Sequence, residues 1–255
     1  MSGPANPPAV EARGIIKSFG SLHVLRGVSL SLHRGEITAV VGDNGAGKST
    51  FMKILSGEYH ADGGELHFGG KRIELGSIQE AQELGVETVY QDLALAPDLS
   101  VAENIYLGRE IVCRGWRGWL RTVDRRAMLD ETRQILGNLE IRLKSYRTPT
   151  RSLSGGQRQA VAVARAIKWA RHAVLMDEPT AALGAKQRTM VYDAIRSAAR
   201  RSLAVLLISH DIPQVLELAH NIVVLRHGQA VARLDPAQVS VRDVINAMLG
   251  EANNS

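Results

Sequence analysis

The chain has 255 residues, of which 45% are hydrophobic and 22% are charged, and its formal net charge is +5. This composition is typical of a soluble globular protein with a sizeable core, and no apolar run reaches the roughly 18 residues that a membrane-spanning helix needs. A single cysteine, Cys113, excludes an internal disulfide and indicates a reducing compartment, and the first residues lack the basic and apolar regions of a signal peptide.

Strands and helices alternate along much of the chain. After a proline-rich start, residues 24–33 read as a strand whose apolar alternation slips once near Gly27. Three short, almost wholly apolar segments predict buried strands at residues 36–42, 172–179 and 202–210. A helical pattern follows each of them, at residues 48–56, 185–199 and 212–219. Buried strands that are each followed by a helix predict an α/β fold with a largely parallel core sheet.

The middle of the chain departs from this alternation. Between about residues 92 and 168 the sequence carries helical patterns alone, which predicts a helical subdomain inserted into the α/β body. The whole domain is expected to span residues 9–239, after a flexible N-terminus at residues 1–8. Residues 240–255 are expected to form one short helix, at 241–249, and a tail.

The segment "GDNGAGKST", residues 42–50, matches the phosphate-binding pattern G-x-x-x-x-G-K-[ST] between a buried strand and a helix. Glycines let such a loop wrap around phosphates with its amides pointing inward, and the following helix N-terminus adds positive potential. Lys48 is expected to reach the β- and γ-phosphates and Ser49 to ligate Mg²⁺; a simple glycine-rich turn is the structural alternative. The nucleotide-binding residues predicted in this loop are Gly42, Asn44, Gly45, Ala46, Gly47, Lys48, Ser49 and Thr50.

Two acidic residues end the predicted strand at residues 172–179. Its apolar run delivers Asp177 and Glu178 to the carboxyl end of the strand, where ligands bind in open α/β sheets. Asp177 is then expected to hold the Mg²⁺ shell, and Glu178 to polarise an attacking water as a general base in phosphoryl transfer. The alternative is a strand that simply ends in solvated acids.

The segment "LSGGQ", residues 153–157, begins a predicted helix with two glycines, although glycine costs helix stability. Small residues at a helix start form an anion site. With this motif beside the two above, the chain resembles the ATPase subunit of an ABC transporter over about residues 10–234, and LSGGQ is the signature motif of that family. The resemblance implies the ABC ATPase fold, with an antiparallel β subdomain beside the mainly parallel core sheet.

The resemblance also implies how the signature motif acts. In such ATPases it binds the γ-phosphate of ATP held by the phosphate-binding loop of the opposite subunit. The residues expected to serve the partner's ATP are Ser154, Gly155, Gly156 and Gln157. The two glycines would keep side chains off a phosphate that arrives from another molecule.

Three further positions match the family one at a time. Phe19, in "KSFG", resembles the aromatic residue that stacks on adenine, with a core phenylalanine of an edge strand as the alternative. Gln91 resembles the Q-loop glutamine, which contacts Mg²⁺ or water, and joins Ser49 and Asp177 as an expected metal ligand. His210 resembles the switch histidine, which binds the γ-phosphate and helps to hold the catalytic water. The expected catalytic residues are therefore Lys48, Glu178 and His210.

One position departs from the family pattern. After "DEPT" the family commonly has S-A-L-D, whereas this chain has "AALG", so that Gly184 stands where a carboxylate is usual. In the family that carboxylate bears on the dimer interface. Its replacement by glycine therefore affects the coupling between the two ATP sites of a dimer. It need not abolish hydrolysis, because Glu178 and His210 remain.

The segments around Gln91 and Gly184 are similar to those of monosaccharide-importer ATPases of the half-length type, with one phosphate-binding loop and one signature motif. The resemblance implies an ATP-hydrolysing motor that pairs with a copy of itself. It implies integral membrane permease subunits and a periplasmic substrate-binding protein as partners, with the motor at the cytoplasmic face of the inner membrane. An ABC exporter subunit and a soluble ABC ATPase of translation or DNA repair are the alternatives.

An arginine- and tryptophan-rich segment lies within the predicted helical subdomain. Its members are Arg114, Trp116, Arg117, Trp119, Arg121, Arg125 and Arg126. Such a mixture suits RNA or single-stranded nucleic acid, a membrane surface, a permease, or a solvated loop that covers the subdomain. The last of these is favoured, and no nucleic-acid partner is expected.

Overall fold

The computed structural model describes residues 7–113, 122–181 and 183–251, and they form two compact units. The first unit contains the described residues of Met1–Thr88, Trp169–Glu178 and Ala198–Ser255. The second unit contains those of Val89–Lys168 and Pro179–Ser197. Some positions singled out in the sequence lie outside the described residues: Arg114, Trp116, Arg117, Trp119, Arg121 and Ala182.

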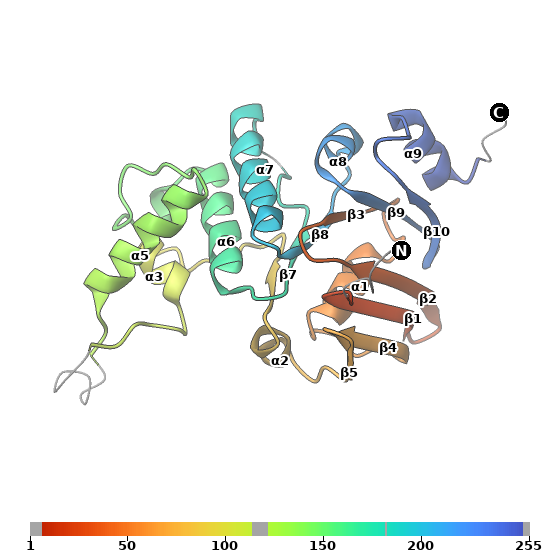
Figure 1. The fold of residues 1–255 in the computed structure, drawn as a ribbon, viewed down its shortest axis with the longest axis horizontal. Helices are drawn as coiled ribbons and strands as arrows, with labels where there is room; N and C mark the ends of the chain where they lie inside the picture. The colour runs from red at the N-terminus through yellow and green to blue at the C-terminus, as the bar shows by residue number, and fades with distance from the viewer. Residues whose placement is uncertain (1–6, 114–121, 182, 252–255) are drawn as a thin grey trace, which may run out of the picture. The chain divides into compact units, whose positions relative to one another are not determined.

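The core sheet belongs almost wholly to the first unit, and its strand order is β10-β9-β3-β8-β7-β6 (Figure 1). The strand bounds are β3 Ile37–Val41, β6 Val86–Val89, β7 Ala173–Asp177, β8 Ala204–Ile208, β9 Asn221–Arg226 and β10 Gln229–Leu234. Strand β3 pairs in parallel with β8 and β9, β8 pairs in parallel with β7, and β9 and β10 are antiparallel. Every residue of β3 and β8 is buried, as expected for strands covered on both faces. The predicted α/β fold with a mainly parallel core sheet is confirmed.

A second sheet of the first unit is antiparallel throughout, with the order β2-β1-β4-β5. Its strands are β1 Val10–Phe19, β2 Leu22–Leu32, β4 Gly63–Phe68 and β5 Lys71–Ile73. The predicted slip near Gly27 is a β-bulge, because the partners of two consecutive β1 residues skip Gly27, which adopts φ +89°. This sheet is the antiparallel subdomain that the family resemblance implied.

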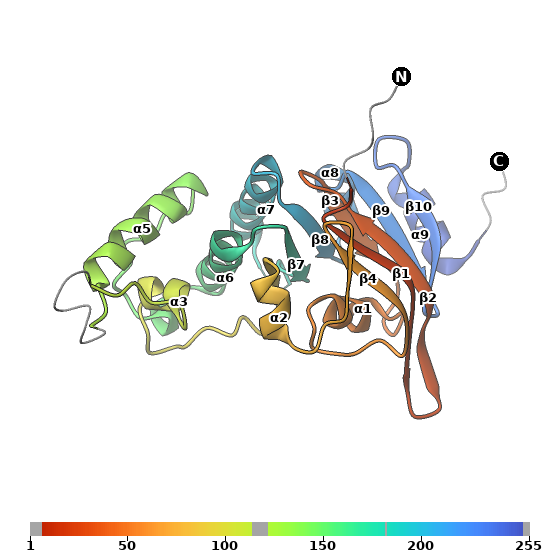
Figure 2. The same cartoon turned by 60° about the horizontal axis from the view of Figure 1, so that its bottom comes forward.

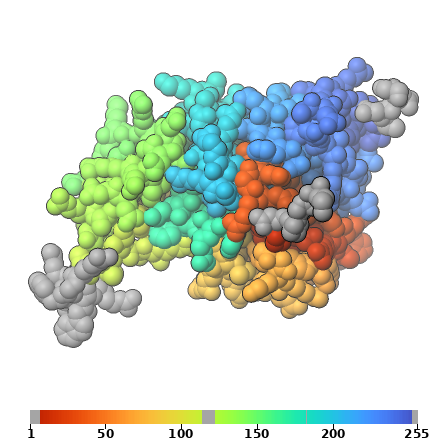
Figure 3. All heavy atoms as spheres, in the orientation of Figure 1, coloured from red at the N-terminus to blue at the C-terminus, as the bar shows by residue number. Residues whose placement is uncertain are grey.

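Helices α8 (Ile212–Leu218) and α9 (Val241–Leu249) cover β3 and β9 (Figures 1 and 2). The apolar cluster between them contains Val215 of α8, Val244 of α9 and several residues of the two strands. Helix α9 has the predicted bounds. In Figure 3 the N-terminal strands and the C-terminal elements adjoin on one surface, and β2 contacts β10, so both ends of the chain build this unit.

Two further helices belong to the first unit, α1 (Lys48–Leu55) and α2 (Ile78–Glu83). Helix α1 follows the phosphate-binding loop as predicted. Helix α2 was not located from the sequence, although Ser77 accepts a hydrogen bond from the Glu80 N–H as an N-cap. None of the helices among the described residues is both long and apolar enough to cross a membrane.

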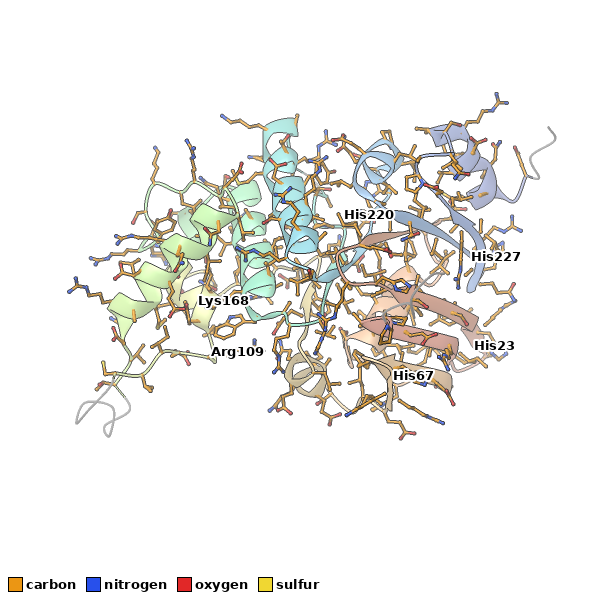
Figure 4. The ribbon with its side chains drawn as sticks, in the orientation of Figure 1. His23, His67, Arg109, Lys168, His220 and His227 are labelled. Carbon is orange, nitrogen blue, oxygen red and sulfur yellow. The ribbon has the colours of Figure 1, made fainter. Side chains whose placement is uncertain are left out.

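Helices dominate the second unit, which also contains residues 179–197, whereas the helical segment predicted from the sequence ends at about residue 168. They are α3 Val101–Tyr106, α5 Arg125–Asn138, the short 3-10 helix η1 Thr150–Ser152, α6 Gly155–Trp169 and most of α7, Ala185–Arg200. Three of them meet at Glu131 of α5, which accepts from Lys168 Nζ at 3.0 Å and from Tyr106 Oη at 2.5 Å. Lys168 is labelled in Figure 4. Burial raises the pKa of Tyr106, so its hydroxyl stays a donor, and that hydrogen bond lowers the pKa of Glu131.

Candidate nucleotide-binding and catalytic site

The phosphate-binding loop leaves the end of β3 and leads into α1, and its glycines have different structural reasons. All three, Gly42, Gly45 and Gly47, have positive φ, between +82° and +153°. A Cβ on Gly42 would lie 2.1 Å from the Leu225 carbonyl oxygen, and one on Gly47 would lie 2.7 Å from the Leu25 side chain. A Cβ on Gly45 would meet nothing within 4 Å. Gly42 and Gly47 are therefore required by packing as well as by backbone conformation, and Gly45 by conformation alone.

This difference yields a stability prediction. Gly42→Ala should lower the free energy of unfolding by about 2–5 kcal/mol, because the strained φ and the backbone clash add. Gly45→Ala, the matched control, should lose only the conformational part, about 1–2 kcal/mol. Urea unfolding of the two nucleotide-free variants measures both values. Equal losses in the two variants would contradict the assignment of Gly42 to packing against Leu225.

Lys48 is 9% exposed and folded into its own loop, where Nζ donates to the carbonyl oxygens of Gly42 at 2.7 Å and Asp43 at 2.9 Å. Burial lowers the pKa of Lys48, and the nearby carboxylates of Glu178, Asp177 and Asp43 oppose that shift. The Lys48 ammonium group can exchange these two neutral carbonyl acceptors for anionic oxygens such as those of a phosphate, because hydrogen bonds between charged groups are stronger.

The two predicted metal ligands of the first unit, Ser49 and Asp177, lie side by side. The Ser49 hydroxyl is close enough to the carboxylate of Asp177, which ends β7, to lower the pKa of that carboxyl. Burial raises the pKa of Asp177, the Ser49 hydroxyl opposes this, and the charge of Glu178 adds to it. The third expected ligand, Gln91, belongs to the second unit, in the bend just after β6.

Glu178 and His210 also meet, because they follow the neighbouring parallel strands β7 and β8. His210 Nδ1 lies 3.2 Å from Glu178 Oε1, with the histidine side chain 69% exposed and the glutamate 26%. The backbone of Glu178 takes φ +47°, a strained value for a residue with a side chain, and its N–H donates to the Ile208 carbonyl at 3.0 Å. The strand end therefore holds this carboxylate in a conformation that local preference alone would not select.

Phe19 ends β1 and is 45% exposed. Its ring stands edge-to-face on Tyr59, with centroids 5.4 Å apart at 71°, and Lys17 Nζ lies 5.4 Å from the ring centre. Because the residue is 45% exposed, the alternative of a core phenylalanine is wrong. The exposed part of the ring can take part in stacking.

The signature segment of the second unit is a capping box, a feature that its S-x-x-Q spacing could have shown. Ser154 Oγ accepts from the Gln157 N–H at 3.3 Å, and Gln157 Oε1 accepts from the Ser154 N–H at 3.0 Å. The N–H groups of Gly155 and Gly156 belong to the first turn of α6, where N–H groups have no partner within the helix. The capping box thus orders a turn that presents backbone donors.

The two signature glycines differ in their surroundings. Gly155 is exposed, and a Cβ there would meet nothing within 4 Å. Gly156 is buried, and a Cβ there would lie 2.6 Å from both Cβ and Cγ of Gln187. Clearance for a phosphate is the reason predicted from the sequence for both glycines, and Gly156 has a second reason within its own chain, its contact with Gln187.

Gln187 is a further residue of this region and was not predicted from the sequence. Its Oε1 accepts from the Gly184 N–H at 3.0 Å, and the Gly184 carbonyl accepts from the Gln187 and Arg188 N–H groups, both at 3.0 Å. Gly184, which stands where the family commonly has a carboxylate, therefore begins α7 with a cap supplied from three residues ahead. The spacing G-x-x-Q was the available signal.

Comparison with known proteins matches residues 25–181 to the family described as ABC transporter. The fructose import ATP-binding protein of Rhizobium meliloti is 44% identical over 248 residues, which cover 96% of this chain and 95% of that protein. The xylose/arabinose import ATP-binding protein of Sulfolobus acidocaldarius is 41% identical, with 96% of each chain covered. The ribose import ATP-binding protein of Burkholderia cenocepacia is 41% identical over 98% of this chain, which matches 48% of that protein.

Solved structures show the same fold. A nucleotide-free ATP-binding cassette from an ABC transporter superposes with a TM-score of 0.80 at 24% identity, with 96% of both chains covered. An ATP-binding cassette in its ADP conformation gives a TM-score of 0.78 at 24% identity, with 95% of both chains covered.

Proposed function

The chain belongs to the ABC transporter family, and on that basis we propose that it is the ATP-hydrolysing motor subunit of an importer for a monosaccharide. The observation that carries the proposal is its likeness, over 95% or more of both chains, to import ATP-binding proteins for fructose and for xylose/arabinose. The ribose import ATP-binding protein, which the chain also matches, is named for a further monosaccharide.

ATP is held by the phosphate-binding loop in this proposal. Lys48 exchanges its contacts with the Gly42 and Asp43 carbonyls for phosphate oxygens, which form stronger, charge-assisted hydrogen bonds. The exposed ring of Phe19 stacks on the adenine base. The remaining residues assigned to the nucleotide are Asn44, Gly45, Ala46, Gly47, Ser49 and Thr50.

Mg²⁺ is the proposed cofactor, and the donor set fits it. No group of three or more histidine, cysteine, aspartate or glutamate side chains suited to a metal occurs in the described ranges. Mg²⁺ does not need one, since it is usually bound through one or two carboxylates together with substrate phosphates. Ser49 and Asp177, which lie side by side, would hold the ion, with Gln91 as a further ligand from the family resemblance. When bound, Mg²⁺ neutralises charge on the phosphates.

Glu178 is the proposed general base. Its carboxylate accepts a proton from the attacking water, while His210, 3.2 Å away, orients that water and donates toward the γ-phosphate. Because the strained backbone at Glu178 is held by the Ile208 carbonyl, the base is preorganised before substrate arrives.

The site is completed by a second subunit. The first turn of α6, with Ser154, Gly155, Gly156 and Gln157, serves the γ-phosphate of ATP bound to the other copy, so the working form is a homodimer. ATP binding closes the dimer and hydrolysis reopens it, and integral membrane permease subunits receive the motion. A periplasmic substrate-binding protein delivers the sugar, and the motor acts at the cytoplasmic face of the inner membrane.

Transport by the reconstituted complex tests the proposal. The chain, its permease and its binding protein, placed together in proteoliposomes, should take up radiolabelled ribose, xylose or fructose only when ATP and Mg²⁺ are on the motor side. Glu178→Gln in the same vesicles is the control for coupling to hydrolysis. Export of substrate, or transport that needs no binding protein, would replace the importer with an exporter.

A further inference from the structure

We propose that Gln187 is a positioning residue that joins the start of α6 to the start of α7, so that the signature turn and the loop entering α7 hold one geometry. The signature turn is residues 154–157, and the loop entering α7 is residues 183–184, directly before the first residue of that helix. The inference rests on the proposed function, in which the signature turn serves the ATP of a second subunit. Its first test nevertheless needs neither nucleotide nor hydrolysis.

Contact with Gly156 is the first observation. The stem of Gln187 occupies the space beside the Gly156 Cα, because an added Cβ would come within 2.6 Å of Gln187 Cβ and Cγ and 3.0 Å of its Cδ. The Cβ of Gln187 cannot move away without the backbone that carries it, whereas Cγ and Cδ can turn about the side-chain torsions. The side chain of Gln187 therefore packs directly against Gly156, the buried second glycine of the signature turn.

The cap on α7 is the second observation. The same side chain turns back so that Oε1 accepts from the Gly184 N–H at 3.0 Å. Gly184 has no side chain with which to cap the helix, so in the part of the chain that the structure describes Gln187 supplies the side-chain cap of this turn. One residue thus packs on one helix start and caps the other.

A double-mutant cycle on nucleotide-free protein tests the contact. Gly156→Ala should lower Tm by roughly 2–10 °C, because its methyl group overpacks against Gln187. The neighbouring Gly155→Ala is the matched control, and it should leave Tm unchanged or raise it, since alanine favours helix and the site is open. In a Gln187→Gly background the loss caused by Gly156→Ala should vanish, while the effect of Gly155→Ala stays the same.

The effect of Gly156→Ala in the two backgrounds decides whether Gln187 contacts Gly156. If Gly156→Ala lowers Tm equally in both backgrounds, Gln187 is not its neighbour in solution and the proposal is overturned. If Gly156→Ala fails to fold, recovery of folding in the double variant supports the contact, and failure of both variants overturns it. Because no nucleotide is present, these results are independent of whether the chain is an importer motor.

The positioning role needs a second readout. Gln187→Glu retains an acceptor for the Gly184 N–H, whereas Gln187→Leu keeps the stem and loses the acceptor. The leucine variant should lose roughly 2- to 30-fold in kcat and in ATP-dependent dimerisation of a hydrolysis-blocked Glu178→Gln form, with the KM for ATP unchanged. The glutamate variant should restore both. Unchanged kcat and dimerisation in Gln187→Leu would show that Gln187 is only a packing residue and would overturn its positioning role. A wild-type protein that neither hydrolyses ATP nor dimerises would overturn the proposed function instead.

Discussion

Replacement of Glu178 by glutamine should leave ATP binding intact and slow hydrolysis about 10²–10⁴-fold, the usual range for loss of a general base. The amide keeps the size of the carboxylate but cannot accept a proton from water. His210, which lies 3.2 Å from the carboxylate, would remain, but the group beside it would no longer accept the proton of the attacking water. The variant should therefore accumulate as an ATP-bound dimer.

Steady-state turnover, ATP affinity and size-exclusion chromatography with and without ATP measure the three effects. Glu74→Gln makes the same chemical change at an exposed position between β5 and α2, and it should leave turnover at the wild-type level. Near-normal hydrolysis in Glu178→Gln would show that the base lies elsewhere, whatever the state of the dimer.

A mixture of two inactive variants should recover activity if the signature turn serves the ATP of the other subunit. Lys48→Ala removes the charge-assisted contact to phosphate that we propose for this side chain and should weaken ATP binding about 10- to 100-fold. Gly155→Asp places a negative charge at an open helix start, where it repels an arriving phosphate. Each homodimer carries its defect in both sites and should be nearly inactive.

In the heterodimer one site carries both defects and the other carries neither. Differently tagged subunits, purified through both tags, should therefore regain up to about half of the wild-type rate if the two sites act independently. Gly184, in place of the usual carboxylate, bears on this coupling, so ATP-dependent dimerisation is measured beside turnover. Verified heterodimers that recover neither property would remove the support for a trans-acting signature turn.

Several elements could be predicted from short stretches of sequence because their causes are local. A wholly apolar run predicts a buried strand wherever it lies, and β3, β7 and β8 were located in this way. The G-x-x-x-x-G-K-[ST] pattern between a strand and a helix is likewise contiguous, as is the S-x-x-Q spacing that caps α6. The strands β1, β4, β5, β6, β9 and β10 were not predicted. In β1, β4, β5 and β10 exposed or half-buried residues interrupt the apolar ones, so the apolar pattern is weak, and β6 has only four residues. Strand β9 carries a buried apolar run at residues 222–225, which was an available signal.

Contacts between distant segments were decided by the tertiary structure. The parallel order β3-β8-β7 brings the ends of three strands to one edge of the sheet, which places Ser49 against Asp177 and Glu178 against His210. No local pattern encodes which strands become neighbours, because strand order follows from how the whole sheet packs.

The signature glycines show the same division. The sequence alone determined that two residues without side chains begin a helix, since their composition and spacing are contiguous. Only the folded chain distinguishes Gly155, which stays open, from Gly156, which receives Gln187. The physical reason is that a glycine's neighbours are set by packing between helices, and packing joins residues far apart in the chain.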